Sequence, residues 1–185
     1  YDIQHYSEHL SFCSIDNKQL YELLPLPMTM KMVDYISDRI SQAQDALGRT
    51  IVLENASYYY VPYAEMEETD FINAIMEKSG AKMLLDINNV FVNSHNHHFD
   101  AKAWLDKINN KHVAYMHIAG HMEMTPELYI DTHGAPVKDE VWELLSHVRR
   151  SGIAAPALLE RDNDVPDYDI LLDEYAYMKK VYDEA

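Results

Sequence analysis

Four short apolar runs of this chain each end on a side chain that can bind a metal ion. The residues that end them are Glu54, Asp86, His117 and Glu160. If the runs are parallel strands of one barrel, these side chains lie at carboxyl-terminal strand ends, where barrel enzymes assemble their active sites. The pattern predicts a metal centre at that end of a barrel.

Three further candidate ligands lie outside these runs. His9 lies in an alternating polar and apolar segment over residues 7–12, which predicts an additional strand. Asp131 and His133 are two residues apart, so both side chains reach one metal centre if the segment is extended. Imidazole and carboxylate are common ligands of zinc, iron and manganese.

The charge gathered at such a centre sets the number of ions that it needs. Four carboxylates at one barrel mouth carry a desolvation and repulsion cost of several kcal/mol per ion unless cations compensate it. One divalent ion does not neutralise four charges, whereas two or three do, with the histidines as neutral nitrogen donors. Because the lone Cys13 offers no thiolate-rich site, the donor set favours iron, manganese or zinc over copper(I).

Each candidate also has an ordinary structural alternative. Asp86 precedes two asparagines and is also suited to capping a helix or turn. His117 is also consistent with a hydrogen-bonded core histidine, and Arg161 with an ion pair that neutralises its acidic neighbours. A histidine-rich stretch, expected to be a loop, is suited either to binding metal or to solvent exposure; its members are His95, His97 and His98.

Residues His5 to His9 match the His-x-x-Glu-His pattern of one group of metalloproteases. That pattern needs both histidines on one face of a helix. Here it runs into the alternating segment that predicts a strand, where the two histidines do not share a helical face. The sequence therefore argues against a protease.

Helical spacing separates the apolar runs. We expect a first helix over residues 30–47, closed by Gly48, and a second over residues 69–78 with Thr69 as its capping candidate. Further helices are expected after Asp100, after Asp139 and after Pro166. Strand and helix alternating in this way predict an α/β fold with parallel strands and helical crossovers.

An open doubly wound sheet also fits this alternation. We favour a TIM (β/α)8 barrel because no glycine-rich phosphate loop follows any predicted strand and the chain holds only 5 glycines. A complete barrel takes about 250 residues, and this chain has 185. We therefore expect one domain over residues 1–185, forming the carboxyl-terminal two-thirds of a barrel without its first strands.

Composition narrows the partners and the compartment. With 31 acidic and 15 basic residues the formal charge is −16, which disfavours a nucleic-acid partner. No apolar run is long enough to span a membrane, and no signal pattern is visible at the start. A single cysteine favours a reducing compartment, so the cytoplasm is expected.

A series of motifs then falls in register with a known family. They are Ser-Glu-His-Leu-Ser-Phe (7–12), Leu-Leu-Pro-Leu-Pro (23–27), Leu-Gly-Arg (47–49), Leu-Glu-Asn-Ala-Ser (53–57), Leu-Leu-Asp-Ile-Asn-Asn-Val (84–90), Asn-His (96–97), His-Ile-Ala-Gly-His (117–121), Asp-Thr-His-Gly (131–134) and Glu-Arg-Asp (160–162). In this order they resemble the DUF692 family, also called UPF0276. The resemblance covers nearly the whole chain.

The resemblance implies a barrel related to xylose-isomerase-like proteins that holds two or three iron ions. It further implies an enzyme that uses dioxygen to oxidise cysteine in ribosomally synthesised peptides, for natural product biosynthesis. A precursor peptide and a small partner protein that binds its leader are the implied partners.

Carried over by position, the resemblance assigns metal ligands on this chain. They are His9, Glu54, Asp86, His117, Asp131, His133 and Glu160, with Asn89 at a place where some relatives use histidine for a third metal. His97 matches the Asn-His element and has no assigned role. The family's first strands, which carry another histidine ligand, have no counterpart before Tyr1.

Two other functions use similar ligands. A zinc- or manganese-dependent sugar isomerase or hydrolase of the same barrel class would turn over without dioxygen. A non-catalytic peptide-binding module would keep its partner after the loss of Glu54 or His117. Oxygen uptake and metal content separate these alternatives from an iron-dependent oxidative enzyme.

Overall fold

The computed structural model describes residue 3, residues 5–60 and residues 63–185. The chain forms two compact units, Tyr1–Leu84 with Lys107–Ala114 and Leu85–Asp106 with Tyr115–Ala185. We describe each unit by itself. The expectation of one domain over residues 1–185 stays a prediction.

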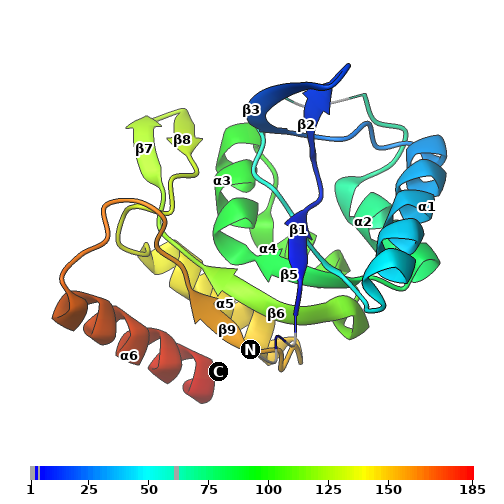
Figure 1. Ribbon diagram of the computed structural model, residues 1–185. Coiled ribbons are helices and arrows are strands. Elements are labelled where there is room, and N and C mark those ends of the chain that lie inside the picture. Colours follow the sequence, from blue (N-terminus) through cyan, green and yellow to red (C-terminus); the bar gives the residue numbers. More distant parts are fainter. Residues whose placement is uncertain (1–2, 4, 61–62) are drawn as a thin grey trace. The chain divides into compact units, whose positions relative to one another are not determined.

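The described residues form helices and strands that alternate along the chain (Figure 1). The helices are α1 (Met30–Leu47), α2 (Glu68–Ser79), α3 (Ile87–His97), α4 (Ala101–Lys107), α5 (Asp139–Arg150), α6 (Tyr168–Glu184) and the short 3-10 helix η1 (Asn110–His112). The strands are β1 (Ser7–His9), β2 (Phe12–Ile15), β3 (Lys18–Leu24), β4 (Val52–Glu54), β5 (Lys82–Asp86), β6 (Val113–Ile118), β7 (Met122–Thr125), β8 (Leu128–Ile130) and β9 (Ala157–Leu159).

Strand pairing confirms the predicted α/β class. Strand β4 pairs in parallel with β1 and with β5, and β6 pairs in parallel with β9. Each of the four predicted apolar runs forms one of these strands. The described strands do not close into a barrel, so the complete barrel stays a prediction.

Helix α1 has the boundaries that the sequence predicts. Thr29 caps its amino end, because its Oγ1 accepts a hydrogen bond from the backbone N–H of Met32 at 3.1 Å. Gly48 ends it with a φ of 65°, the left-handed conformation in which glycine is favoured. Val33 and Ile40 of the predicted apolar stripe are buried, while Leu47 at its end is exposed.

The predicted cap of α2 is wrong. The helix begins at Glu68, with Glu67 in the capping position and no side-chain capping bond. Thr69 lies inside the first turn with its side chain buried, so burial of this residue replaces the expected capping role. The predicted apolar face is correct, since Ile72 and Ile75 are both buried.

The predicted strand over residues 7–12 ends earlier than expected. Strand β1 stops at His9, and Phe12 already belongs to β2, which forms an antiparallel hairpin with β3. Asp16 and Asn17 turn this hairpin with φ values of 50° and 61°, a conformation that these two residue types tolerate. His9 therefore occupies the carboxyl-terminal end of a parallel strand.

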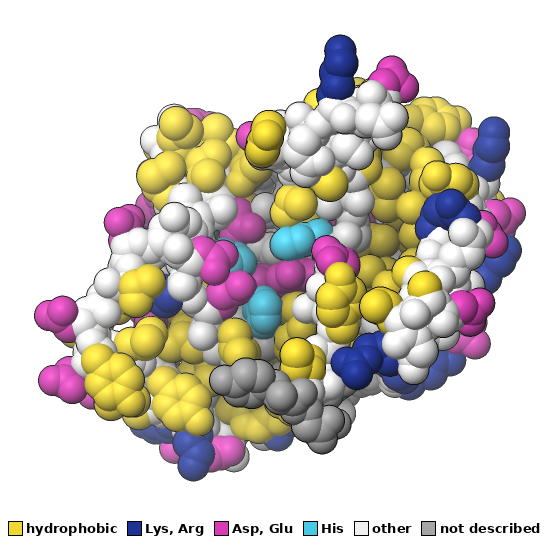
Figure 2. Space-filling model, in the orientation of Figure 1, with side chains coloured by type: hydrophobic (Ala, Val, Ile, Leu, Met, Phe, Trp, Pro, Cys, Tyr) yellow, Lys and Arg dark blue, Asp and Glu magenta, His cyan; other side chains and the backbone are white. Residues whose placement is uncertain are grey.

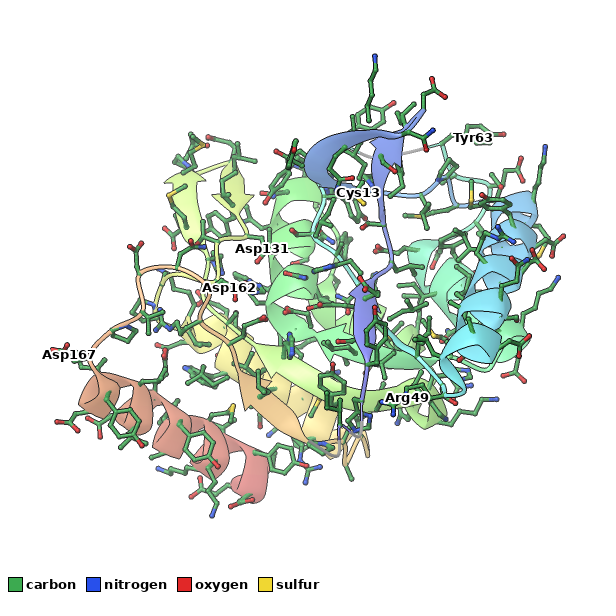
Figure 3. All side chains as sticks on the ribbon, viewed as in Figure 1. Cys13, Arg49, Tyr63, Asp131, Asp162 and Asp167 are labelled. Atoms are coloured by element: carbon green, nitrogen blue, oxygen red, sulfur yellow. The ribbon has the colours of Figure 1, made fainter. Side chains whose placement is uncertain are left out.

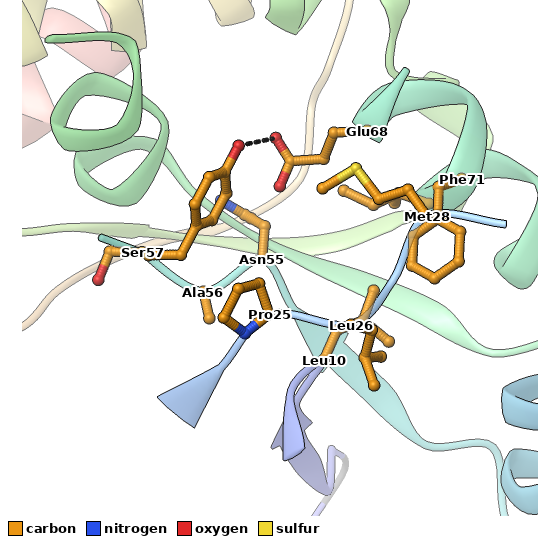
Figure 4. Close-up of a pocket in the computed structure, with 11 residues that line it drawn as sticks. Leu10, Pro25, Leu26, Met28, Asn55, Ala56, Ser57, Glu68 and Phe71 are labelled. Carbon is orange, nitrogen blue, oxygen red and sulfur yellow. Dashed lines mark hydrogen bonds between the residues drawn. The ribbon is translucent and has the colours of Figure 1, made fainter. Parts of the chain in front are cut away.

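The first unit also contains a small pocket, drawn in Figure 4, whose lining is mostly apolar. Leu10, Leu26 and Phe71 are among its lining residues. At its polar side, the Tyr58 hydroxyl donates a hydrogen bond to Glu68 at 3.4 Å. Burial, together with the neighbouring Glu68 carboxylate, raises the pKa of Tyr58 above its ordinary value, so this hydroxyl stays protonated.

In the second unit, the histidine-rich stretch is mostly helical. Residues Ile87–His97 form α3, whereas the sequence suggested a loop. Val90 and Val92 are buried on different sides of the helix, and this burial compensates for the weak helix propensity of its asparagines. His98 ends the helix with a φ of 59°.

The hairpin of β7 and β8 packs against α3 (Figure 1). The Asn96 side chain forms two hydrogen bonds with the backbone of Tyr129, one to its carbonyl and one from its N–H, both at 2.9 Å. The His95 ring stacks on the Tyr129 ring with 3.6 Å between centroids. This contact fixes the end of β8, from which residues 131–134 continue.

Helices α5 and α6 pack together at the other side of the second unit. The Trp142 and Tyr177 rings meet edge to face, and the Arg149 guanidinium lies 3.8 Å from the centre of the Tyr182 ring.

Among the described residues, no helix combines the length and the apolar character needed to cross a membrane.

Candidate metal centre

Three side chains from the ends of strands converge in the second unit. His117 Nδ1 lies 2.8 Å from Glu160 Oε2 and 3.8 Å from Asp86 Oδ2. Parallel pairing aligns His117 with Leu158. Because side chains alternate along a strand, Glu160 faces the same side as Leu158 and therefore meets His117.

Residues after β8 bring a second imidazole to the same carboxylates. His133 Nε2 lies 2.7 Å from Asp131 Oδ1 and 3.7 Å from Asp86 Oδ2. His133 Nδ1 lies 3.0 Å from Glu160 Oε2 and 3.6 Å from Asp162 Oδ2. Figure 3 labels Asp131 and Asp162 in this part of the unit, and Figure 2 shows histidine and acidic side chains gathered on the face that it draws.

The spacing of these donors fits metal ions. Ligand atoms of Asp86, His117 and Glu160 lie within 4.8 Å of one another, as do those of His133, Glu160 and Asp162. Nitrogen and oxygen ligands of a single divalent ion lie roughly 3–4 Å apart, so each group would need only small side-chain movements to hold an ion. Glu160 belongs to both groups, which suits a carboxylate shared by two ions.

Asp86 caps a helix, one of the roles that the sequence left open, and its other oxygen faces the two imidazoles. Its Oδ1 accepts a hydrogen bond at 2.7 Å from the backbone N–H of Asn89 and so caps α3. Its Oδ2 is the atom near His117 and His133. Asp86 is 0% exposed, so this charge is enclosed among groups that can hold or balance it.

The contacts between His133 and Glu160 raise the pKa of the imidazole and lower the pKa of the carboxyl group. Burial alone lowers the pKa of His133, but hydrogen bonds to Asp131 and Glu160 and the charge of Asp86 outweigh it and raise the pKa to about 11. Burial alone raises the pKa of Glu160, but His117 and His133 lower it far below its ordinary value. Without metal, the proton on His133 balances part of this carboxylate charge, and a bound cation would take its place.

Two predicted ligands lie in the first unit. His9 and Glu54 face each other in the register of β1 and β4, and His9 Nε2 lies 3.6 Å from Glu54 Oε2. Glu54 is buried, while the His9 side chain is exposed. Both residues occupy carboxyl-terminal strand ends, as the sequence predicts, and their role as ligands stays a prediction.

The remaining predicted site residues lie on α3. Asn89 Oδ1 is 3.4 Å from His133 Nε2, at the edge of hydrogen-bonding distance. His97 lies in the last turn of the helix and its role stays open. His95 stacks on Tyr129, and its Nε2 lies 2.9 Å from the carbonyl oxygen of Pro126. These contacts give His95 a role in packing α3 against the hairpin.

Three residues around this centre are absent from the set of ligands that the sequence predicts. Asp162 belongs to the Glu-Arg-Asp motif, and the structure places it near His133. Asn88 and His121 form buried hydrogen bonds that no local spacing indicates.

Arg161 has a different ionic partner from the one expected. The sequence suggested that it neutralises Glu160 and Asp162. In the structure its Nη2 donates to Glu174 Oε2 at 2.6 Å, and the two side chains are 5% and 12% exposed. Glu160 therefore contacts the imidazoles of His117 and His133.

Comparison with known proteins shows the family to which this chain belongs. Residues 1–183 match the family model described as RiPP precursor modification enzyme MbnB/TglH/ChrH, where RiPP denotes a ribosomally synthesised and post-translationally modified peptide. The chain belongs to this family. The resemblance to UPF0276 is confirmed, since the chain is similar to many proteins of that name.

Three UPF0276 relatives illustrate the similarity. The chain is 44% identical over 179 residues to a protein of Acinetobacter baylyi, with 97% of this chain and 62% of the relative covered. It is 46% identical over 166 residues to a protein of Pseudomonas aeruginosa, with 90% and 58% covered. A protein of Alcanivorax borkumensis is 41% identical over 186 residues, with 98% and 61% covered. The chain thus spans about three fifths of the length of these family members.

Gly120 lies where the backbone of the 130s segment leaves no space for a side chain. A Cβ atom there would lie 2.1 Å from the carbonyl oxygen of Ala135 and 2.5 Å from that of Pro136. We expect Gly120→Ala to cost about 1–3 kcal/mol of unfolding free energy and to lower metal content by displacing His133. Denaturant titration and metal analysis measure both effects.

Gly48→Ala is the control, because its added Cβ meets no atom within 4 Å. Its left-handed φ should cost on the order of 1 kcal/mol, with no loss of metal. Equal metal content in both variants would contradict the account of Gly120.

His121 predicts a pH dependence of stability. Burial, with the charge of Lys138 as the next cause, lowers its pKa from 6.5 to about 4 in the folded state. Between pH 6.5 and 4 the unfolded chain binds a proton that the folded chain does not. His121 therefore lowers the unfolding free energy as the pH falls through this window, by up to about 3 kcal/mol.

We expect His121→Phe to lose this component, so that the difference in stability between variant and wild type shrinks or reverses toward pH 4. Denaturant titrations of the metal-free proteins at a series of pH values measure it. Parallel curves for the two proteins would contradict the prediction.

Proposed function

We propose that this protein oxidises cysteine residues of a ribosomally synthesised precursor peptide, using dioxygen and two or three iron ions. Membership of a RiPP-modifying family supports the substrate class. The observation that carries the proposal is the convergence of His117 and His133 on Glu160, at 2.8 and 3.0 Å, beside buried Asp86. The donor set contains only nitrogen and oxygen atoms, which suits iron.

The residues of this chain would bind and orient the ions. Asp86, His117 and Glu160 would hold one ion, and Glu160, His133 and Asp162 a second, with Asp131 beside His133. His9, Glu54 and Asn89 are the further ligands that we propose for the whole protein. Iron, when bound, would supply the one-electron and dioxygen chemistry that amino-acid side chains lack.

Fixed orientation is the contribution that the fold makes to such a reaction. Asp86 is held by the amino end of α3 and His117 and Glu160 by adjacent strands, so these ligand positions are set before a substrate arrives. Preorganised groups of this kind reduce the entropic cost of bringing reactants together. His133 would also release its proton on metal loading, whereas Glu160 is already ionised.

We propose two partners for the whole protein. The substrate would be a precursor peptide containing cysteine, and a small partner protein would present its leader. The family description supports the peptide substrate; the presenting protein is our inference from the resemblance.

The test uses the whole protein, purified without oxygen and loaded with Fe²⁺, together with a cysteine-rich precursor peptide encoded beside its gene and the adjacent partner. We expect oxygen consumption, measured with an electrode, to accompany a mass change confined to cysteine residues. Replacing each cysteine of the precursor peptide with serine should abolish both the oxygen consumption and the mass change. Turnover with Zn²⁺ or Mn²⁺ in the absence of oxygen would instead support the isomerase or hydrolase alternative.

A further inference from the structure

Asn88 connects a proposed metal ligand to a buried histidine. Its side chain is 0% exposed in the first turn of α3. Its Nδ2 donates a hydrogen bond to Asp131 Oδ1 at 2.8 Å, and its Oδ1 lies 2.8 Å from His121 Nδ1. In sequence, His121 lies 33 positions and Asp131 43 positions from Asn88. Only the fold brings the three residues together.

The chemistry of these groups fixes the direction of both hydrogen bonds. The Asp131 oxygen accepts the hydrogen bond, so the Asn88 amide nitrogen faces it and the Asn88 oxygen faces His121. That oxygen can only accept, so His121 carries its proton on Nδ1. The His121 ring therefore locks the Asn88 amide in the orientation that donates to Asp131.

The His121 ring is held by its neighbours. It stacks on Tyr129 with 4.9 Å between centroids and lies 5.2 Å from the Phe91 ring. Tyr129 belongs to β8 and is bound to α3 through Asn96. Asp131 follows β8 by one residue, so the same hairpin carries the ligand and the platform for His121.

We infer that Asn88 and His121 are positioning residues that hold Asp131 in the orientation in which it binds metal beside His133. This inference rests on the proposed function, because it requires metal at Asp131. Asp131 Oδ1 is 2.7 Å from His133 Nε2, so rotation of the Asp131 carboxylate would also disturb the position of the His133 ring. Hydrogen-bond partners of metal ligands contribute to affinity in this way.

Two substitutions at His121 separate the hydrogen bond from the packing. His121→Phe keeps a ring against Tyr129 and Phe91 but removes the Nδ1 donor. His121→Asn places an amide nitrogen near the former Nδ1 position but removes the ring. His95→Phe is the matched control, because it keeps the other ring stacked on Tyr129 and makes no hydrogen bond toward Asp131.

The measurement is an Mn²⁺ titration of the metal-free whole protein, followed by electron paramagnetic resonance of the free ion, with thermal unfolding of the same samples. We expect His121→Phe to weaken the affected site about 10–100-fold while its melting temperature stays near that of His95→Phe. His121→Asn should keep most of the affinity and lose thermal stability. Asn88→Ala should weaken Mn²⁺ binding as His121→Phe does.

Equal Mn²⁺ affinity in wild type, His121→Phe and Asn88→Ala would overturn the inference and leave the proposed function intact. Equal losses in His121→Phe and His121→Asn would also overturn it, because the effect would then follow packing rather than the donor. Absence of Mn²⁺ and Fe²⁺ binding by the wild type would overturn the proposed function and this inference together.

Discussion

Replacing Asp86 and His117 together by alanine is expected to remove at least one of the metal ions that we propose to balance the carboxylates. These residues supply two of the donors in the group to which Glu160 also belongs. The loss leaves Glu160 with His133 as its close imidazole partner at 3.0 Å. Elemental analysis of anaerobically purified wild type and variant measures the difference.

Because Asp86 also caps α3, the alanine variant carries a stability cost of about 1 kcal/mol that is unrelated to metal. Asp86→Asn with His117→Phe is the better matched variant, since asparagine retains the cap and removes the negative charge. His147→Ala serves as the control, because His147 Nε2 lies 2.7 Å from Asp106 Oδ1 and the Asp106 side chain is 54% exposed. Retention of all metal in the Asp86 and His117 variants would contradict the ligand assignment.

Glu174→Ala is expected to destabilise the protein by about 3–5 kcal/mol, because it leaves the charge of Arg161 buried without its carboxylate partner. Arg161 Nη2 lies 2.6 Å from Glu174 Oε2. The other oxygen of Glu174 accepts from the backbone N–H of Val137 at 2.7 Å. One side chain on α6 thus holds both the segment after β9 and the segment before α5, and denaturant titration measures its contribution.

An exposed ion pair provides the control. Lys102 and Glu143 approach to 3.7 Å with both side chains more than half exposed, so Glu143→Ala should change stability by less than about 1 kcal/mol. A similar small change for Glu174→Ala would show that solvent compensates Arg161. Both measurements use metal-free protein, so that stability and metal content remain separate.

The parts of the fold that sequence predicts best have local causes. Helix α1 carries its own signals, a capping Thr29 and a closing Gly48, so its boundaries follow from the sequence. Strands β4, β5, β6 and β9 are predictable because each is a short apolar run. The capping prediction at Thr69 failed because tertiary packing buries that side chain, and no local pattern reveals which neighbour covers a residue.

The same distinction applies to the candidate site. Strand-end positions made Asp86, His117 and Glu160 predictable, and the structure brings them within ligand distance of one another. Asn88 and His121 were not predicted as site residues, because their roles depend on contacts between distant segments. A helix over residues 87–97 was also missed, since asparagine and histidine favour other conformations and buried Val90 and Val92 decide the outcome.

The central claim is that these carboxylates and imidazoles bind several metal ions. Elemental analysis of the whole protein, purified without oxygen and without added metal or chelator, tests it most directly. The account predicts about two or three iron ions per chain, the number that balances the gathered carboxylates, and their loss in the Asp86 and His117 variants. Wild-type protein that contains no metal and takes up none from Fe²⁺, Mn²⁺ or Zn²⁺ would contradict it.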